Sequence, residues 1–189
     1  MDKREAILNA AVSLFTTRGF QETTTAEISR NANVATGTLF NYFPSKFELI
    51  NQLFLYCKES MAAALQVEEA EQNDYRTAFE LMWERGIRWG LEHPRMFWFF
   101  RQFEASPYLT EIIRRNGSVR FEFIRSFLER GVARGILRDA PENLLYRFVI
   151  STTSGIVEEL LLTDEDPNHY IPASFALVWA GIVSPQARR

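Results

Sequence analysis

The segment from residue 7 to residue 49 constrains the fold of this chain more than any other, because apolar residues and helix-ending signals alternate in it at short intervals. Its first apolar residues recur with the spacing of one face of a helix: Ile7, Leu8, Ala11, Leu14 and Phe15. Gly19 follows them in the position of a left-handed helix cap. We therefore predict a first helix that ends near Gly19.

Two shorter helices are predicted directly after this first one. Thr24 and Glu27 have the three-residue spacing of a capping box, which starts the second helix. The third is expected over residues 36–43, because Pro44 cannot continue a helix and disfavours helical backbone in the residue before it. With Val34 as the apolar residue of the turn between them, the two helices form a predicted helix-turn-helix.

The order and spacing of these residues resemble the DNA-binding domain of the TetR family of bacterial repressors. The matching residues are Ala10, Ala11, Leu14, Phe15, Gly19, Phe20, Thr23, Thr24, Ile28, Ala32, Val34, Gly37, Thr38, Leu39, Tyr42, Phe43, Ser45 and Lys46. The resemblance covers roughly the first 50 residues. It implies an all-α fold of about nine helices, with an N-terminal three-helix DNA-binding domain and a C-terminal helical bundle for ligand binding and dimerisation.

The resemblance also implies where double-stranded DNA is contacted. Contacts to the DNA backbone are expected from Thr24, Thr25, Thr38, Tyr42 and Lys46. Contacts to base edges are expected from Thr36, Gly37, Phe40 and Asn41. Lys46 is the strongest phosphate candidate, because it places a positive charge at a helix N-terminus, where backbone amides also favour anions. Taken singly, Thr38, Tyr42 or Lys46 could equally be an ordinary solvated position.

Two residues depart from the pattern of the family. Ala35 stands where the family usually has a serine at the entrance to the recognition helix, although Thr36 could cap the helix one residue later. Phe40 stands where the family usually has a tyrosine, so one hydroxyl is lost while a ring that can pack on a sugar or a thymine methyl remains. Both changes argue against a direct transfer of an operator sequence from other members.

Six further helices are predicted after Pro44 from the positions of proline, glycine and acidic residues. Their expected ranges are 45–67, 74–92, 94–104, 107–134, 141–162 and 170–183. Gly135 is the expected C-terminal cap of the helix over 107–134. We divide the chain into a helix-turn-helix DNA-binding domain over residues 1–46 and a helical ligand-binding and dimerisation domain over residues 47–189.

The charge of the chain gives little support to DNA binding by itself. The net charge is −3, and residues 1–46 carry five basic and four acidic side chains, so the remainder carries −4. Local geometry must therefore supply a positive surface. No run of 18 apolar residues occurs, and the N-terminus lacks the apolar core of a signal peptide. We expect a cytoplasmic protein without a membrane partner.

The sequence contains no motif that is typical of a catalytic or redox site. The two histidines, His93 and His169, lie far apart, and no metal-ligand spacing, nucleophile motif or glycine-rich phosphate loop occurs. We therefore expect no enzymatic activity and no cofactor. The single cysteine, Cys57, could be a redox sensor, but its place inside a helical pattern favours a packing role.

The part of the chain after the predicted DNA-binding segment is rich in aromatic residues, and this richness leaves two functions open. Rings between helices of a bundle often line an apolar ligand site, which would make the protein a repressor released by a small apolar or aromatic effector. The expected lining is Met61, Phe79, Met82, Trp83, Phe97, Phe100, Phe103, Phe121 and Phe127, with Gln102 or Glu158 as polar anchors. The same rings could instead form a solid core. The protein would then be a DNA-binding architectural or protein-recruited factor without an effector.

A homodimer is expected, because one short recognition helix contacts too few bases for useful specificity. Two such helices spaced about 34–36 Å apart would read a palindromic operator. Small and apolar residues recur at helical spacing on the last two predicted helices: Leu145, Phe148, Thr152, Gly155, Ala173, Ala176, Leu177, Ala180 and Gly181. The alternative is that this face packs within the monomer.

Overall fold

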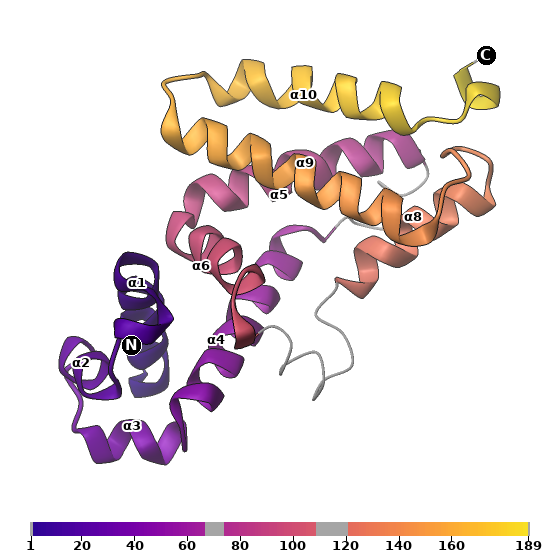
Figure 1. Ribbon diagram of the computed structural model, residues 1–189. Coiled ribbons are helices and arrows are strands. Elements are labelled where there is room, and N and C mark those ends of the chain that lie inside the picture. Colours follow the sequence, from indigo (N-terminus) through magenta and orange to yellow (C-terminus); the bar gives the residue numbers. More distant parts are fainter. Residues whose placement is uncertain (1, 67–73, 109–120, 189) are drawn as a thin grey trace. The chain divides into compact units, whose positions relative to one another are not determined.

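The computed structural model describes residues 2–66, 74–108 and 121–188, and over these ranges it is all-α (Figure 1). The helices are α1 (Lys3–Glu22), α2 (Thr25–Asn31), α3 (Thr36–Tyr42), α4 (Lys46–Ala64), α5 (Tyr75–Glu92), α6 (Pro94–Glu104), α8 (Glu122–Ala133), α9 (Glu142–Leu162) and α10 (Pro167–Ile182), followed by the 3-10 helix η2 (Pro185–Arg188). The predicted fold class is confirmed. None of the described helices is long and apolar enough to cross a membrane.

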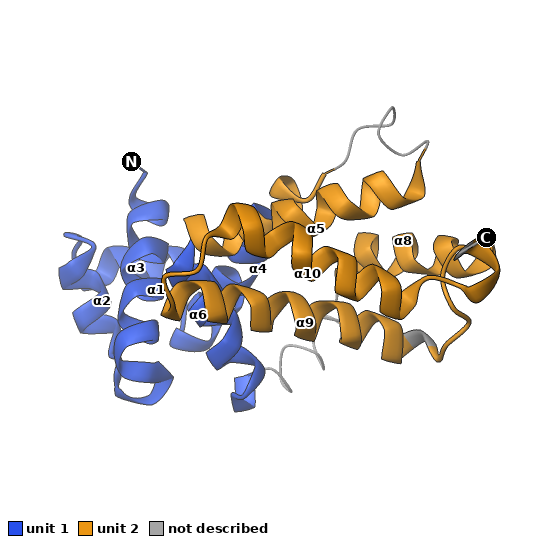
Figure 2. Cartoon of the chain, turned by 90° about the horizontal axis from the view of Figure 1, so that it is seen from above, with its two compact units in different colours: residues 1–60, 93–119 blue, residues 61–92, 120–189 orange. Residues whose placement is uncertain are grey.

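The chain forms two compact units (Figure 2). The first comprises residues 1–60 and 93–119, and the second comprises residues 61–92 and 120–189. Most of α4 and all of α6 therefore pack with the N-terminal helices. The domain boundary predicted at residue 46 stays a prediction, because a compact unit defined by packing need not coincide with a functional domain.

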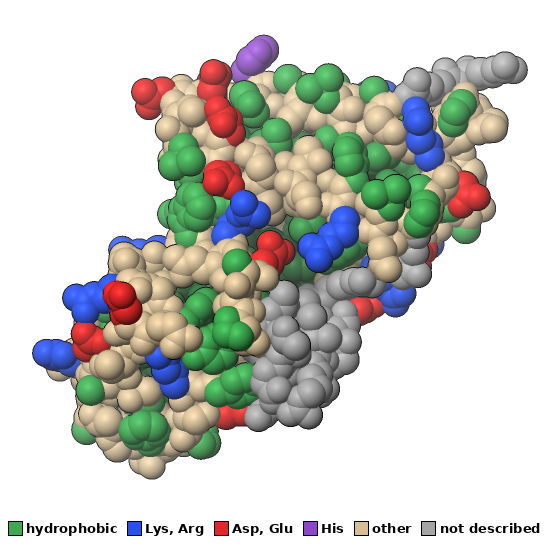
Figure 3. All heavy atoms as spheres, viewed as in Figure 1, with side chains coloured by type: hydrophobic (Ala, Val, Ile, Leu, Met, Phe, Trp, Pro, Cys, Tyr) green, Lys and Arg blue, Asp and Glu red, His purple; other side chains and the backbone are tan. Residues whose placement is uncertain are grey.

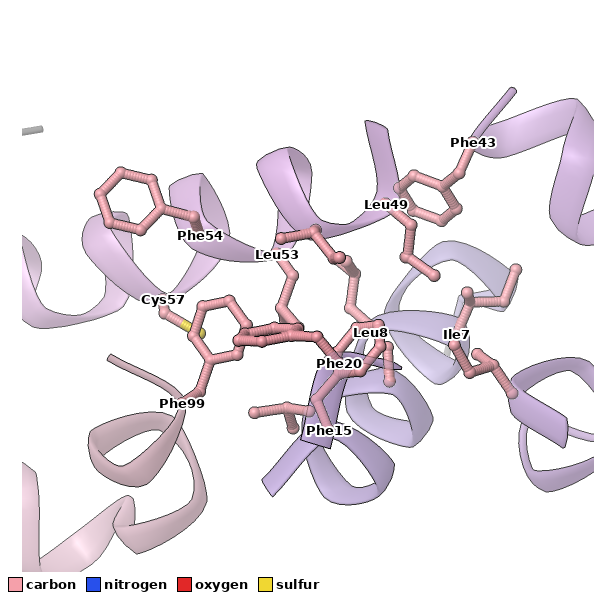
Figure 4. Close-up of a cluster of buried hydrophobic side chains, with 14 of the residues drawn as sticks. Ile7, Leu8, Phe15, Phe20, Phe43, Leu49, Leu53, Phe54, Cys57 and Phe99 are labelled. Carbon is pink, nitrogen blue, oxygen red and sulfur yellow. The ribbon is translucent and has the colours of Figure 1, made fainter. Parts of the chain in front are cut away.

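The first unit is built around the apolar face predicted for α1. Figure 4 shows Ile7, Leu8 and Phe15 directed toward the same interior as Leu53 and Phe99. The ring of Phe54 stacks on that of Phe103 at a centroid distance of 4.7 Å. Among the largest fully buried side chains of the protein, this core contains Phe15, Phe43, Phe99, Phe103, Ile7, Leu8, Ile28, Leu39, Leu49, Ile50 and Leu53. Large buried areas of this kind hold the short helices α2 and α3 in place.

Cys57 belongs to the same core. Its side chain is fully buried, and burial raises the pKa of the thiol to about 12. The thiolate, which is the reactive form, is therefore not populated near neutral pH. These properties support a packing role for Cys57.

The second unit has an aromatic core between α5, α8 and α10. The ring of Tyr75 stacks on Phe127 at 4.4 Å, and its hydroxyl donates to the carbonyl of Phe127 at 2.9 Å. Phe79 lies 6.0 Å from Phe127 and 5.9 Å from Phe175. The indole N–H of Trp83 donates to the hydroxyl of Ser174 at 3.2 Å. Around Phe79 these rings form a packed aromatic core in which each ring has a close neighbour, and Phe127 lies at the edge of this core.

Helix ends that depend on local signals lie close to the predicted positions. Gly19 has φ 83°, and three further residues of α1 follow this kink. Gly135 has φ 69°, and the amides of Gly135 and Ile136 donate to the carbonyls of Val132 and Gly131, each at 2.9 Å. This pair of bonds is the expected glycine cap of α8.

Other helix ends differ from the prediction. The prediction of a single helix over 107–134 is wrong at Phe121, which has extended backbone. The amide of Phe121 donates to the Tyr146 hydroxyl at 3.2 Å, and α8 starts at Glu122. Residues 109–120 of that predicted helix lie outside the described residues. α10 begins before the predicted residue 170, because the side chain of Asp166 accepts a hydrogen bond from the amide of Asn168 at 3.0 Å.

Candidate nucleic-acid interface

The start of α2 is fixed by the predicted capping box. The hydroxyl of Thr24 accepts a hydrogen bond from the amide of Glu27 at 3.2 Å, and the carboxylate of Glu27 accepts one from the amide of Thr24 at 3.0 Å. Arg18 forms an ion pair with the same carboxylate at 2.7 Å. The bonds from Thr24, more than the charge of Arg18, lower the pKa of Glu27. The cap therefore joins the end of α1 to the start of α2.

The turn between α2 and α3 depends on a residue that the sequence analysis did not single out. Asn33 has φ 53°, a left-handed conformation that asparagine tolerates better than most residues. It lets the amide of Val34 donate to the carbonyl of Ser29 at 3.0 Å. The Asn–Ala–Asn sequence around this position could have indicated such a turn.

α3 presents one side to the core and the other to solvent. Leu39 is fully buried and fixes the helix, and Phe43 is buried just after its end. Six of the nine predicted DNA contacts are exposed: Thr24, Thr36, Gly37, Phe40, Asn41 and Tyr42. Thr25, Thr38 and Lys46 are half-buried. The sequence of α3, TGTLFNY, has no charged residue, and in Figure 3 the surface over α3 is mostly tan and green.

Gly37 lies on the exposed side of α3. A Cβ atom built on this residue would meet nothing within 4 Å. Its backbone is part of the helix and does not have the positive φ that favours glycine at Gly19 and Gly135. A glycine inside a helix costs stability, roughly 0.5–1 kcal/mol relative to alanine. Neither packing nor backbone conformation within the chain explains this glycine, whereas close approach of another molecule would.

Positive charge lies beside α3. Lys46 is the first residue of α4, whose start is capped by the hydroxyl of Ser45 through a 3.1 Å bond from the amide of Glu48. Partial burial lowers the pKa of Lys46. Arg30, in the last turn of α2, is exposed and was not among the predicted contacts, although its position next to the turn indicates such a role. The uncharged face of α3 suits contacts to base edges, and the basic residues beside it suit contacts to phosphates.

The predicted dimer residues lie mostly on the exposed side of α9 and α10. Leu177 is 77% exposed and Phe148 is 44% exposed. Gly155, Ala173, Ala176, Ala180 and Gly181 are also exposed. Thr152 is half-buried, and its hydroxyl donates to the carbonyl of Phe148 at 2.7 Å. A Cβ atom on Gly181 would lie 3.9 Å from the ring of Phe148, so this ring joins the two helices into one face.

Leucines on α9 require one correction to this set. Leu145 is buried inside the unit, and its neighbour Leu144 is exposed in its place. Leu162 is exposed as well and lies 18 residues beyond Leu144, which is five helical turns and hence the same side of α9. We name Leu144, Phe148, Gly155, Leu162, Ala173, Ala176, Leu177, Ala180 and Gly181 the α9–α10 face. The missed leucines could have been found by extending the helical spacing in both directions from Phe148.

The predicted ligand-lining residues are divided between the two units. Phe97, Phe100, Gln102 and Phe103 belong to the first unit, and Met61, Phe79, Met82, Trp83, Phe121, Phe127 and Glu158 belong to the second. Phe103 is a core residue, and the side-chain amide of Gln102 donates to the carbonyl of Thr16 at 3.1 Å. Phe79 and Trp83 belong to the solid aromatic core.

The second unit has a hollow of about 370 Å³ that includes two of these residues. Its lining consists of Ala62, Leu65, Gln66, Met82, Phe123, Phe127 and Arg130. The guanidinium of Arg130 lies 5.8 Å from the centroid of the Phe127 ring. Met82 and Phe127 were predicted, whereas the others were not, because they lie in the last turn of α4, just beyond its end, or in the first and last turns of α8, where the apolar pattern is weak.

Comparisons with known proteins agree with this architecture. Residues 7–53 match the family model of the bacterial regulatory proteins, tetR family. A protein from Shewanella sp. PV-4 that is described as a tetR family transcription regulator is 33% identical to this chain, and the match covers 97% of this chain and 99% of that one with a TM-score of 0.87. A TetR family transcription regulator from Marinobacter aquaeolei VT8 is 26% identical, with 96% of each chain covered and a TM-score of 0.85. The HTH-type transcriptional repressor KstR2 of Mycobacterium tuberculosis is 26% identical over 80% of this chain and 78% of that protein.

Proposed function

The chain belongs to the TetR family of bacterial regulatory proteins, and from this premise we propose that it is a transcriptional repressor that binds a palindromic operator as a homodimer. A small apolar or aromatic effector releases it from the DNA. The protein acts in the cytoplasm, where bacterial DNA lies. The observation that carries the DNA-binding part is the exposed, uncharged side of α3, which Leu39 fixes from below and basic residues flank.

Contacts to base edges come from the solvent-facing side of α3. Asn41 is exposed there and has an amide that can pair with adenine through two hydrogen bonds. Gly37 lets the helix backbone approach the groove closely. This approach explains why a glycine stands at a position where neither packing nor backbone conformation requires one. Thr36 and Phe40 complete the contacts on either side.

Contacts to phosphates come from the residues around α3. Lys46 brings a charge to the N-terminus of α4, and Tyr42 is 42% exposed with a hydroxyl that can donate to phosphate. Thr24 already donates its hydroxyl hydrogen to Glu27 at 2.9 Å, so it must break this bond to contact phosphate. Thr25, which follows it, and Thr38 can donate without that cost.

The α9–α10 face supports the homodimer. Monomeric proteins rarely expose large apolar side chains in a continuous row, and such rows mark interaction sites. Small residues between Phe148 and Leu177 let a second pair of helices approach closely. In a two-fold dimer the same face serves both copies, so one patch is sufficient.

The hollow in the second unit supports the effector. Its volume of about 370 Å³ is within the range of small-molecule sites, and most of its lining is apolar. Ala62 connects it to the DNA-binding residues along the chain, because Ala62 and Lys46 lie on the one helix α4. An effector releases DNA only if it binds the non-DNA conformation more tightly. A coupling of about 1–3 kcal/mol, typical of allostery, would lower affinity for the operator by roughly 5- to 150-fold.

The solid aromatic core favours a second candidate function. Because Phe79, Trp83 and Phe175 pack against their neighbours, the second unit could serve as a dimer scaffold for a DNA-binding architectural or protein-recruited factor. A thermal-shift screen of apolar and aromatic compounds separates the two functions, with each hit retested for release of DNA. Hits that both stabilise the protein and release DNA support the effector-controlled repressor. A screen without such hits favours the scaffold.

Selection of bound duplexes from a random pool tests the proposed function as a whole. The repressor is expected to enrich a palindrome whose half-sites are centred about 34–36 Å apart. Enrichment of no sequence, or of one unpaired half-site, would contradict it.

A further inference from the structure

Phe40 is an aromatic side chain that its own protein leaves uncovered. Its side chain is 43% exposed on α3, and no ring or cation of the described residues packs against it. Tyr42, on the same helix, is exposed to a similar 42%, but its ring lies 6.3 Å from that of Phe43. Phe40 is thus the apolar group that α3 offers to a partner.

The neighbours of Phe40 on the helix keep the ring accessible. Residues three and four positions before it lie on the same side of a helix, and here these are Gly37 and Thr36. Gly37 has no side chain, and space around it is open. The side of α3 next to the ring therefore carries only a glycine and the short side chain of Thr36.

The chemistry of phenylalanine restricts what this ring can contact on DNA. It has no hydrogen-bonding group, so it gains nothing directly from a phosphate or from a polar base edge. The thymine C5 methyl is the apolar group that a base pair displays in the major groove. The adjacent residue Asn41 is suited to adenine, so both side chains favour A·T pairs.

We infer that Phe40 packs against the C5 methyl of one thymine in each half-site and thereby determines a preference for thymine at that position. This inference rests on the proposed function, because it needs α3 to lie in the major groove. Phe40 in this role is a specificity-determining residue. A tyrosine at position 40 would bring a hydroxyl group next to the thymine methyl. The preference for thymine therefore depends on the phenylalanine of this chain.

Removal of single methyl groups from the DNA tests the inference. Every thymine of a selected palindrome is replaced by deoxyuridine, one symmetry-related pair at a time, and affinity is measured by fluorescence anisotropy with the full-length protein. At one pair the replacement is expected to weaken binding about fourfold for each methyl, the value for burial of one methyl-sized group. With Phe40→Ala the same replacement should leave affinity unchanged.

Tyr42→Ala is the matched control, because it removes the other exposed ring of α3. It should weaken binding to all duplexes and keep the thymine-to-deoxyuridine ratio of the unmodified protein. Equal ratios for the unmodified protein and Phe40→Ala at every thymine would overturn the inference, since Phe40 would then contact a sugar or nothing. Unmodified protein that prefers no selected duplex over scrambled DNA would overturn the proposed function, and the inference with it. Thermal unfolding of Phe40→Ala confirms that the variant is folded.

Discussion

At the scale of single residues, glycines show most directly what belongs to the fold and what belongs to function. Gly135 and Gly19 have φ of 69° and 83°, which other residues adopt only with strain. Gly90 is required for packing, because a Cβ atom there would lie 2.6 Å from a methyl group of Val157. Gly37 has neither requirement. It is therefore the glycine whose replacement should separate stability from DNA binding.

We predict that Gly37→Ala increases the free energy of unfolding by about 0.5 kcal/mol, because alanine loses less backbone entropy in a helix. The same change should weaken binding to the selected operator, since the new methyl group enters the contact surface. Gly135→Ala is the control, and it should lower stability by about 1 kcal/mol through its positive φ while the affinity for DNA stays the same. Urea unfolding and operator titration of both variants check this. Undiminished operator affinity of Gly37→Ala would show that DNA does not approach this residue.

At the scale of elements, the helix-turn-helix depends on short-range capping bonds as well as on its core. The cap of α2 ties Thr24, Glu27 and Arg18 together, so the orientation of α2 depends on an ionised carboxylate. The pKa of Glu27 is lower in the folded protein than its ordinary value of 4.5, chiefly because of the bonds from Thr24. A group of this kind stabilises the fold above its unfolded pKa and loses this contribution as pH falls through the folded pKa.

The pH dependence of this cap is our second prediction. The unmodified protein should be more stable than Glu27→Gln at pH 7. The difference between them should shrink as the pH falls below about 4.5, the ordinary pKa at which Glu27 takes up a proton in the unfolded chain, toward the lower pKa of the folded protein. Unfolding of both proteins at matched pH values measures the difference and removes the effect of other carboxyl groups. A difference that stays constant between pH 7 and pH 3.5 would contradict the assigned role of the carboxylate.

Helix ends that depend on contacts between neighbouring residues could be predicted from the sequence, whereas those that depend on distant residues could not. The capping box at Thr24, the helix end before Pro44 and the cap at Gly135 depend on neighbouring residues, so their patterns were sufficient. The start of α8 depends on the Tyr146 hydroxyl, which lies 25 residues beyond Phe121 in the chain. No local pattern contains such a contact.

The candidate sites show the same limit. Periodicity indicated the exposed side of α3. On α9 it could not decide which of Leu144 and Leu145 is exposed, because two adjacent leucines can each be assigned to the buried or to the exposed side of the helix. It also could not separate rings of a solid core from rings of a hollow, since both need the same apolar residues. Only the structure distinguishes the two, because Phe79 packs against Trp83 and Phe175, whereas Phe127 also lines the hollow.

At the scale of the whole molecule, the proposed recognition of a palindrome requires two copies of the chain. The α9–α10 face offers a row of exposed apolar side chains, and Leu177 is the most exposed of them at 77%. A palindrome is read by two α3 helices, one from each copy, in successive turns of the major groove. Loss of the dimer should therefore affect specific DNA binding far more than nonspecific binding.

We predict that Leu177→Glu produces a monomer, because the proposed interface would bury the new carboxylate of each copy without a partner. Light scattering at micromolar concentration should give the mass of one chain, and the affinity for the full palindrome should fall toward that for one half-site. Ala63→Glu, at an exposed position of α4, is the control and should leave the mass unchanged. A dimer that persists in Leu177→Glu would place the interface elsewhere.

In the proposed function, α3 contacts base edges while the residues around it bind phosphates. The salt dependence of binding tests it most directly, with the unmodified protein, Lys46→Ala and Asn41→Ala on selected and scrambled duplexes. Lys46→Ala should weaken binding to both duplexes alike and reduce the slope of log affinity against log salt by about one unit. Asn41→Ala should weaken binding to the selected duplex by about 1–3 kcal/mol and leave the scrambled duplex unaffected. An unchanged salt slope for Lys46→Ala, together with equal losses on both duplexes for Asn41→Ala, would contradict the account.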